Sequence, residues 1–391
     1  ALQSLWITHM AVCLEGLNSA VSFGRIDQYL LPFYEQDISR GEITPEKALE
    51  LLLCFSAKTT EHLFLLSGRT SEYHGGHLVA QAATVGGMDA DGRDAVVLNF
   101  TESTDYIQRN AFVLTELLGQ LQAVVAPDQD LAVIGASMGG LVGRYALAWL
   151  ENQGAPARVR TFISFDAPHG GANIPLGVQY WLDFFQDQAA DAAYLLGRLD
   201  TPAARQMLLY HHTSPPGTTG QSDPLRAALL ADFAAVGGWP QQPRLAAVAN
   251  GSGARADQGY AAGAQLISYE YASFLVDIVG NVWAVPDAAS LRIFQGLIDL
   301  IWPLPDASMS VTVAATRPWD NAPGGYRATL AQMDTTAVTY GDIVALHPNH
   351  CFVPTVSALA LPTDDPFFDV AGTTDLATLT PFDAVDRKSV V

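Results

Sequence analysis

The chain has 391 residues, of which 49% are hydrophobic and 15% charged, so it can bury a large core and is not an intrinsically disordered protein. Its formal net charge of −20 argues against binding to nucleic acids or anionic membrane surfaces, because both attract basic patches. The most apolar region, residues 265–302, is interrupted by charged residues and a proline. It lacks an uninterrupted apolar run of about 18 residues, so we expect no stable membrane insertion.

Residues 1–95 have the pattern of a helical segment. Within it, Thr44, Pro45 and Glu46 predict a helix start, with a threonine cap, a proline in the first turn and an acid near the positive end of the helix dipole. His74 and His77 are too few for a metal site. The chain begins with Ala1 and shows no signal peptide, which we interpret as a processed form or a fragment of unknown localisation.

Three stretches of this segment carry a family resemblance: Ser22–Asp37, Gly41–Glu46 and Val85–Ala95. They resemble an internal piece of glycyl radical enzymes of the pyruvate formate-lyase type. The chain contains neither a Gly-Cys-x-x-Pro-like loop nor an Arg-Val-Ser-Gly-Tyr-like radical loop. Without these loops we expect the segment to be a structural remnant that carries no radical chemistry.

The next part of the chain alternates between predicted strands and helices. The β-branched run Val96–Phe100 predicts a buried strand, and Ser103, Thr104 and Asp105 offer caps for the helix that follows. That helix has apolar residues at helical spacing, namely Ile107, Ala111, Leu114, Leu118 and Leu121. Strands are predicted at residues 131–134 and 159–165. This order predicts a mainly parallel sheet with right-handed crossovers.

A serine motif lies between the strand at 131–134 and the helix that follows it. Residues 135–139 read Gly-Ala-Ser-Met-Gly and fit the pattern G-x-S-x-G. A sharp strand-to-helix turn exposes the hydroxyl of such a serine, and the N–H of the next residue can donate to an oxyanion. The motif predicts Ser137 as a nucleophile and Met138 as an oxyanion-hole donor.

The remaining elements complete an α/β pattern. Residues 176–235 are rich in helix formers and aromatic residues, and residues 244–249 predict a further strand. Residues 265–302 are predicted to form more helices, so we expect helical cap insertions at about 176–235 and 262–305. Alternation at 310–315 and the stretch 338–346 predict two late strands.

Three stretches of residues 96–391 carry a second resemblance: Asp105–Ala111, Ser137–Leu147 and Phe165–Pro175, together with the histidine-containing stretch His347–Leu359. They resemble lipase- and esterase-like α/β-hydrolases of bacteria, which are often exported. The resemblance implies an α/β-hydrolase-like fold over 96–391 in which a late histidine, His350, is the base. His347 is the alternative, whereas the resemblance gives His169 a structural place beside the site.

Such hydrolases use a catalytic triad of serine, histidine and an acid, and the acid is less well defined in this sequence. The order serine, acid, histidine favours an aspartate after the strand at 244–249, which indicates Asp257. Asp320 and Asp166 are its rivals. In this hypothesis Ser137 attacks an ester carbonyl, His350 accepts the proton and the aspartate orients the histidine.

The sequence therefore predicts a serine hydrolase that acts on a small-molecule or lipid-like ester without a metal or cofactor. The hydrolases it resembles begin with strands and an oxyanion loop that are replaced here by residues 1–95. An alternative is thus a catalytically inactive hydrolase-like scaffold or a chimeric protein, and a third is a glycyl radical enzyme remnant. The oligomeric state is not predicted.

Overall fold

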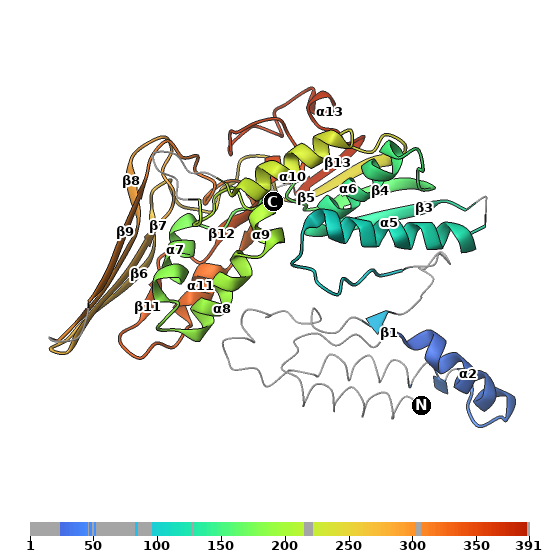
Figure 1. Cartoon of the computed structure of the whole chain (residues 1–391), viewed down its shortest axis with the longest axis horizontal. Coiled ribbons are helices and arrows are strands. Elements are labelled where there is room, and N and C mark those ends of the chain that lie inside the picture. The colour runs from blue at the N-terminus through green and yellow to red at the C-terminus, as the bar shows by residue number, and fades with distance from the viewer. Residues whose placement is uncertain are drawn as a thin grey trace. The chain divides into compact units, whose positions relative to one another are not determined.

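The computed structural model describes residues 24–45, 47–48, 51, 83–84, 96–126, 129–214, 222–301 and 306–388. The chain divides into two compact units, residues 1–99 and 100–391 (Figure 1). No helix among the described residues is long and apolar enough to cross a lipid bilayer. His74, His77 and the stretch Val85–Ala95 lie outside the described residues.

The described part of the first unit contains one long helix and a short strand pair. Strand β1 (Gly24–Arg25) pairs in parallel with β2 (Ala83–Thr84), and helix α2 (Ile26–Ser39) follows β1 directly. The predicted helix start at Thr44 is confirmed, because the Thr44 hydroxyl accepts a hydrogen bond from the Lys47 N–H at 3.2 Å.

A parallel sheet forms the base of the second unit and confirms the predicted α/β class. Its order is β13 (Ala384–Lys388), β5 (Arg244–Ser252), β4 (Val159–Phe165) and β3 (Leu131–Ala136), with every neighbouring pair parallel. The predicted strands at 131–134, 159–165 and 244–249 are therefore confirmed. Among the described residues, β3 is an edge strand of the sheet, since it pairs with β4 on one side.

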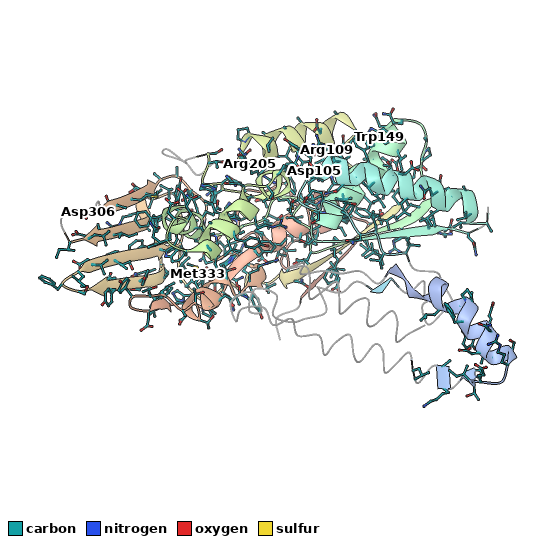
Figure 2. All side chains as sticks on the ribbon, turned by 60° about the horizontal axis from the view of Figure 1, so that its bottom comes forward. Asp105, Arg109, Trp149, Arg205, Asp306 and Met333 are labelled. Carbon is teal, nitrogen blue, oxygen red and sulfur yellow. The ribbon has the colours of Figure 1, made fainter. Side chains whose placement is uncertain are left out.

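Two helices cover this sheet. Helix α5 (Ile107–Val124) buries the predicted apolar face and packs on α6 (Met138–Asn152), which in turn packs on β3 and β4. The predicted cap at 103–105 is wrong, because Tyr106 is the N-cap residue and makes no side-chain cap bond. The Gln206 side chain caps the helix in place of residues 103–105, because it accepts the Ile107 N–H at 2.8 Å. Asp105 instead forms an ion pair with Arg109 at 3.1 Å (Figure 2).

The predicted strand at Val96–Phe100 is wrong. These residues have no regular secondary structure, and Val96 and Val97 are exposed. Their β-branched sequence favours an extended backbone, but a strand also needs a neighbour to pair with. The stretch crosses the boundary between the two units at residue 99, and in the described part of the chain the sheet ends at β3.

The described part of residues 176–235 is rich in helices, as predicted. They are α7 (Leu176–Phe185), α8 (Ala190–Leu199), α9 (Pro202–Met207) and α10 (Pro224–Ala235). Helix α10 has a side-chain cap, because Asp223 accepts the Leu225 N–H at 2.8 Å. Their role as a cap over a site stays a prediction.

The predicted helices at 265–302 are wrong, because these residues form an antiparallel sheet. Its order is β11 (Ile343–Ala345), β6 (Gln265–Ala272), β7 (Val276–Trp283), β8 (Leu291–Leu300) and β9 (Ala307–Val313). Buried and less buried residues alternate along β7, which is the period of a strand. Glycines let α7 approach closely, since a Cβ at Gly296 or Gly280 would collide with aromatic rings of α7.

The remaining elements connect the two sheets within the second unit. Strand β10 (Gly324–Arg327) pairs antiparallel with β12 (His350–Pro354), and helices α11 (Thr329–Asp334), α12 (Thr355–Ala358) and α13 (Leu376–Leu379) are short. The late strands predicted at 310–315 and 338–346 correspond to β9 and β11. Figure 1 shows α7 and α8 between the parallel and the antiparallel sheets.

Candidate functional site

Ser137 occupies a strained turn between β3 and α6, as predicted. Its φ of 50° and ψ of −124° lie in a region that residues other than glycine rarely adopt. Its N–H donates to the Phe165 carbonyl at 2.8 Å, and its carbonyl accepts the Gly140 N–H at 3.0 Å. The serine side chain is exposed, and Met138 opens the helix directly after it.

The turn requires glycine at two positions, one on each side of Ser137. A Cβ at Gly135 would lie 2.6 Å from the Gly140 nitrogen, and a Cβ at Gly140 would lie 2.8 Å from the Ser164 hydroxyl. Both contacts are shorter than side-chain carbons tolerate. Gly135 and Gly140 thus serve the tight packing of strand against helix, which requires no catalytic role for the serine, whereas a Cβ at Gly139, the second glycine of the motif, would meet nothing within 4 Å.

His350 does not meet Ser137 in the described part of the chain. Its side chain is completely buried on β12, where Nδ1 lies 2.8 Å from the Cys351 carbonyl and Nε2 lies 3.1 Å from the Thr329 hydroxyl. Burial lowers the pKa of His350 from its ordinary 6.5 to about 4. The imidazole is therefore a neutral core group that already has partners on both nitrogens.

The other two histidines considered from sequence have different surroundings. His169 is buried between the rings of Trp239 and Phe382, and its Nε2 lies 2.8 Å from the Ser164 hydroxyl. Burial lowers the pKa of His169 well below its usual value. The ring of His347 lies 4.6 Å from that of Tyr260.

Among the described residues, none of the three candidate aspartates forms a hydrogen bond or ion pair with a histidine. Asp257 is exposed and accepts the Gly259 N–H at 2.8 Å in its own turn. Asp166 accepts two hydrogen bonds from Asn250, each at 3.0 Å. Asp320 is buried and accepts the Asn173 side chain at 2.9 Å and the Val285 N–H at 2.7 Å, and burial raises its pKa to about 6. The described residues thus show no assembled serine–histidine–aspartate triad.

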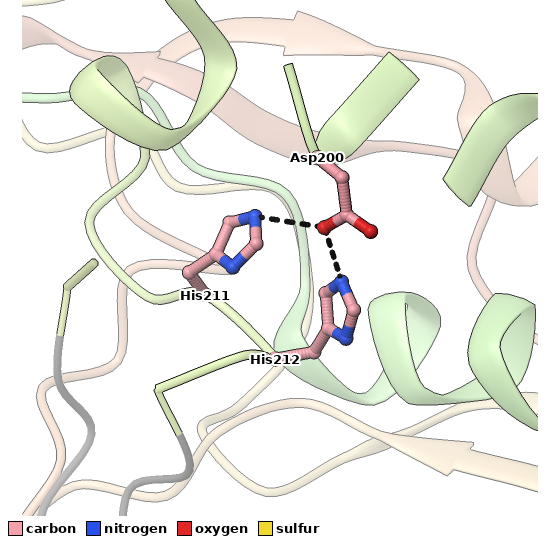
Figure 3. A group of neighbouring side chains, drawn as sticks. All are labelled: Asp200, His211 and His212. Atoms are coloured by element: carbon pink, nitrogen blue, oxygen red, sulfur yellow. Dashed lines mark hydrogen bonds and ion pairs between the residues drawn. The ribbon is translucent and has the colours of Figure 1, made fainter. Parts of the chain in front are cut away.

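A different group of side chains brings a carboxylate together with two imidazoles (Figure 3). Asp200, which caps the end of α8, has its Oδ1 2.8 Å from Nε2 of His212 and 3.6 Å from Nε2 of His211. The potential ligand atoms of the three residues all lie within 4.8 Å of one another. His211 is fully buried, and Asp200 is 39% exposed.

The chain between these residues explains why they meet. Helix α9 follows Asp200 almost directly, and the chain after α9 returns to the end of α8, where Nε2 of His211 lies 3.1 Å from the Leu199 carbonyl. The Gln179 side chain then fixes the segment by accepting the His212 N–H at 3.0 Å and donating to the Tyr210 carbonyl at 2.9 Å. Adjacent histidines at 211 and 212 were the sequence signal for this cluster, but their carboxylate partner cannot be identified without the fold.

Comparison with known proteins concerns the first unit. Residues 1–99 match the pyruvate formate lyase-like family. The chain is 38% identical over 97 residues to isethionate sulfite-lyase of Nitratidesulfovibrio vulgaris and 34% identical over 100 residues to the probable dehydratase YbiW of Escherichia coli. It is 45% identical over 60 residues to the 4-hydroxyphenylacetate decarboxylase glycyl radical subunit of Clostridioides difficile.

These similarities cover little of either partner. They span 24%, 25% and 15% of this chain and 12%, 12% and 7% of the three relatives, in the same order. No solved structure matches the chain. The resemblance of residues 1–95 to glycyl radical enzymes is therefore confirmed, whereas no comparison supports the predicted α/β-hydrolase segment.

The prediction of a serine ester hydrolase, of the esterase or lipase kind, is contradicted. The relatives named above are a lyase, a probable dehydratase and a decarboxylase subunit, and none of these three is a serine hydrolase. The motif around Ser137 predicted its local turn correctly, and the role of Ser137 as a nucleophile stays a prediction. Residues 1–99 match the pyruvate formate lyase-like family, and residues 100–391 form a second unit of mixed α/β fold.

Proposed function

We propose that the chain is a chimeric protein. In it, residues 100–391 form a non-catalytic α/β binding scaffold that follows, in the sequence, a segment related to glycyl radical enzymes. The bonding of His350 carries this proposal. The histidine that a serine nucleophile would need is fully buried and hydrogen-bonded to Cys351 and Thr329. A hydroxyl without a base to accept its proton is a weak nucleophile at neutral pH.

Labelling with a fluorophosphonate probe tests this proposal. Wild-type protein and a Ser137→Ala variant are incubated with the probe, and labelled peptides are identified by mass spectrometry. We expect no labelling at Ser137 and no difference between the two proteins in hydrolysis of a panel of esters. Circular dichroism establishes that both samples are folded. Labelling of Ser137 that the substitution abolishes would overturn the proposal.

The match over residues 1–99 favours a second candidate, a protein that takes part in glycyl radical chemistry. The relatives are named as enzymes, and one of them is named as a glycyl radical subunit. Since the chain spans 12% of the length of the longer-matched relatives, their activities are not carried over to it as a whole. Electron paramagnetic resonance of anaerobically prepared protein distinguishes the candidates: an organic radical signal favours the second, and its absence favours the scaffold.

A further inference from the structure

In the cluster of Asp200, His211 and His212, the hydrogen bonds around His211 bear on which of its ring nitrogens carries a proton. The Thr213 hydroxyl donates its proton to Asp223 at 3.1 Å and lies 2.7 Å from Nδ1 of His211. In the tautomer in which Nδ1 of His211 carries the proton, the hydroxyl accepts from this Nδ1–H. The other ring nitrogen, Nε2, then carries a lone pair.

This lone pair faces two further acceptors. Nε2 of His211 lies 3.1 Å from the Leu199 carbonyl and 3.6 Å from Oδ1 of Asp200. The opposite tautomer would instead use the Thr213 N–H as donor to Nδ1, a longer contact of 3.2 Å. In the arrangement with the shorter contact, three electron-rich atoms converge on one point, and a cation placed there would satisfy all of them.

The end of a helix adds to the negative potential at this point. Leu199 is the last residue of α8 and Asp200 is its C-cap, so both belong to the negative end of a ten-residue helix. Two basic residues are near in the chain. Arg198 lies in the last turn of α8 and is exposed, and Arg205 is paired with the buried Asp223 at 2.7 Å.

We propose that Asp200, His211 and His212 bind a divalent metal ion of the zinc class. Two imidazole nitrogens and one carboxylate oxygen are ligands that zinc accepts, and they are too rich in nitrogen for magnesium or calcium. The Leu199 carbonyl or a water molecule completes the shell. The partial exposure of Asp200 gives the ion a route from solvent.

The present spacing is close to what a tetrahedral zinc site requires. Zinc–ligand bonds of about 2.0–2.2 Å in tetrahedral geometry separate the ligand atoms by roughly 3.3–3.6 Å. The observed separations from Oδ1 of Asp200 are 2.8 and 3.6 Å, and no pair exceeds 4.8 Å. Ligation needs only a small adjustment. The proton that Nε2 of His212 shares with Asp200 moves to Nδ1 of the same ring, so no external acid or base is required.

The surroundings hold the ligands as metal sites commonly do. Nδ1 of His211 is fixed through Thr213 to Asp223, which Arg205 and the Leu225 N–H also bind. Such outer contacts orient an imidazole towards its metal. His212 is fixed by its backbone bond to Gln179. Both histidines are therefore held by hydrogen bonds to neighbouring residues, unlike a pair of exposed histidines on a surface.

Calorimetric titration of the full-length, chelator-treated protein with Zn²⁺ tests the proposal. We expect one zinc ion to bind per chain at this site and Mg²⁺ to give no binding under the same conditions. The substitutions Asp200→Asn and His212→Ala should each weaken zinc binding at least about tenfold. Both positions lie on the more exposed side of the cluster, so these variants keep the test valid even where His211→Ala fails to fold.

Two control variants separate this site from adventitious binding. His347→Ala removes an imidazole outside the cluster and should leave the affinity unchanged. A variant with both His74→Ala and His77→Ala removes the pair of histidines near the glycines of the first unit and should also bind as the wild type does. The proposal is overturned when wild-type protein binds no zinc, when Asp200→Asn and His212→Ala bind like wild type, or when the His74 and His77 variant loses binding.

Discussion

The imidazole of His350 couples folding to pH, because it is completely buried and its pKa falls from 6.5 to about 4. Between these values the unfolded chain binds a proton that the folded chain does not, so stability from this group is lost as the pH falls from about 6.5 towards 4. We expect His350→Gln to reduce the loss of unfolding free energy between pH 7 and pH 5, as measured by urea denaturation at both values.

The comparison for His350 is His347→Gln, a substitution three residues earlier in the chain that leaves the buried imidazole in place. A His350→Gln variant with the same pH dependence as wild type would show that this histidine titrates equally in the folded and unfolded chain. Because the test compares slopes between two pH values, a constant loss of stability from the substitution itself does not affect it.

Thr213 is expected to act on the metal site through His211. Thr213→Val keeps the shape of the side chain but removes the oxygen that lies 2.7 Å from Nδ1 of His211. Loss of such an outer contact costs about tenfold to a hundredfold in metal affinity. Zinc titration should show this loss for Thr213→Val and near wild-type binding for Thr213→Ser, which keeps the hydroxyl. Equal binding by the wild type and the valine variant would contradict the proposed tautomer.

At the scale of elements, the contact of β3 with α6 depends on Gly135. An added Cβ would lie 2.6 Å from the Gly140 nitrogen and would meet backbone atoms of Gly139 still closer, so the helix would have to move away from the strand. Gly135→Ala should therefore lower the free energy of unfolding by about 1–3 kcal/mol or more, as expected for overpacking. Chemical denaturation followed by circular dichroism measures this change.

A matched glycine in α5 gives the opposite expectation. Gly119 lies within the helix, and a Cβ there meets nothing within 4 Å. Gly119→Ala should raise stability by about 0.5–1 kcal/mol through helix propensity alone. A Gly135→Ala protein as stable as Gly119→Ala would mean that the β3–α6 turn is looser than the structure indicates.

The edge of the parallel sheet is a second feature at this scale. Ile134 on β3 is 69% exposed, and among the described residues this strand pairs with β4 on one side. An exposed apolar edge strand promotes association between chains, and a charged residue suppresses it. Ile134→Lys should lower self-association in sedimentation experiments across a concentration series, with the free energy of unfolding changed by no more than about 0.5 kcal/mol.

Leu230→Lys is the control, because Leu230 is 43% exposed on a helix and has no strand edge beside it. An equal reduction of self-association by both lysines would assign the effect to apolar surface in general and not to the strand edge. A larger effect of Ile134→Lys is the expected result.

Local pattern predicted some elements correctly because their periodicity matches their surroundings. The apolar face of α5 and the runs of β3, β4 and β5 are examples. Residues 265–302 were misassigned because a long apolar stretch does not distinguish a buried helix from buried strands by periodicity alone. Val96–Phe100 has strand propensity, but it pairs with no strand in the described part of the chain. Propensity alone therefore could not decide its structure.

The same contrast holds for the sites. The turn at Ser137 is encoded locally by its glycines, and it was predicted. Whether a histidine and an acid reach that serine depends on the fold of the following chain, and the described residues show no such contact. The cluster at Asp200 depends on the return of the chain after α9 towards the end of α8. That return is a tertiary contact with no local signature.

At the scale of the whole molecule, the division into two units predicts that residues 100–391 fold on their own. This unit contains the parallel sheet with its covering helices, the antiparallel sheet and all three proposed zinc ligands. Its 292 residues exceed the size of an ordinary single domain, so it can bury a sufficient core without residues 1–99. A protein of residues 100–391 should therefore unfold cooperatively and bind zinc as the full chain does.

Calorimetry of the full chain and of residues 100–391, each with and without zinc, measures both properties. Zinc should raise the unfolding temperature of the two proteins by a similar amount, because a ligand that binds only the folded state stabilises it according to its affinity and concentration. In Asp200→Asn the increase should be absent from both. Non-cooperative melting of residues 100–391 beside a cooperative full chain would contradict the independence of this unit, since the core of the second unit would then need residues 1–99 to form.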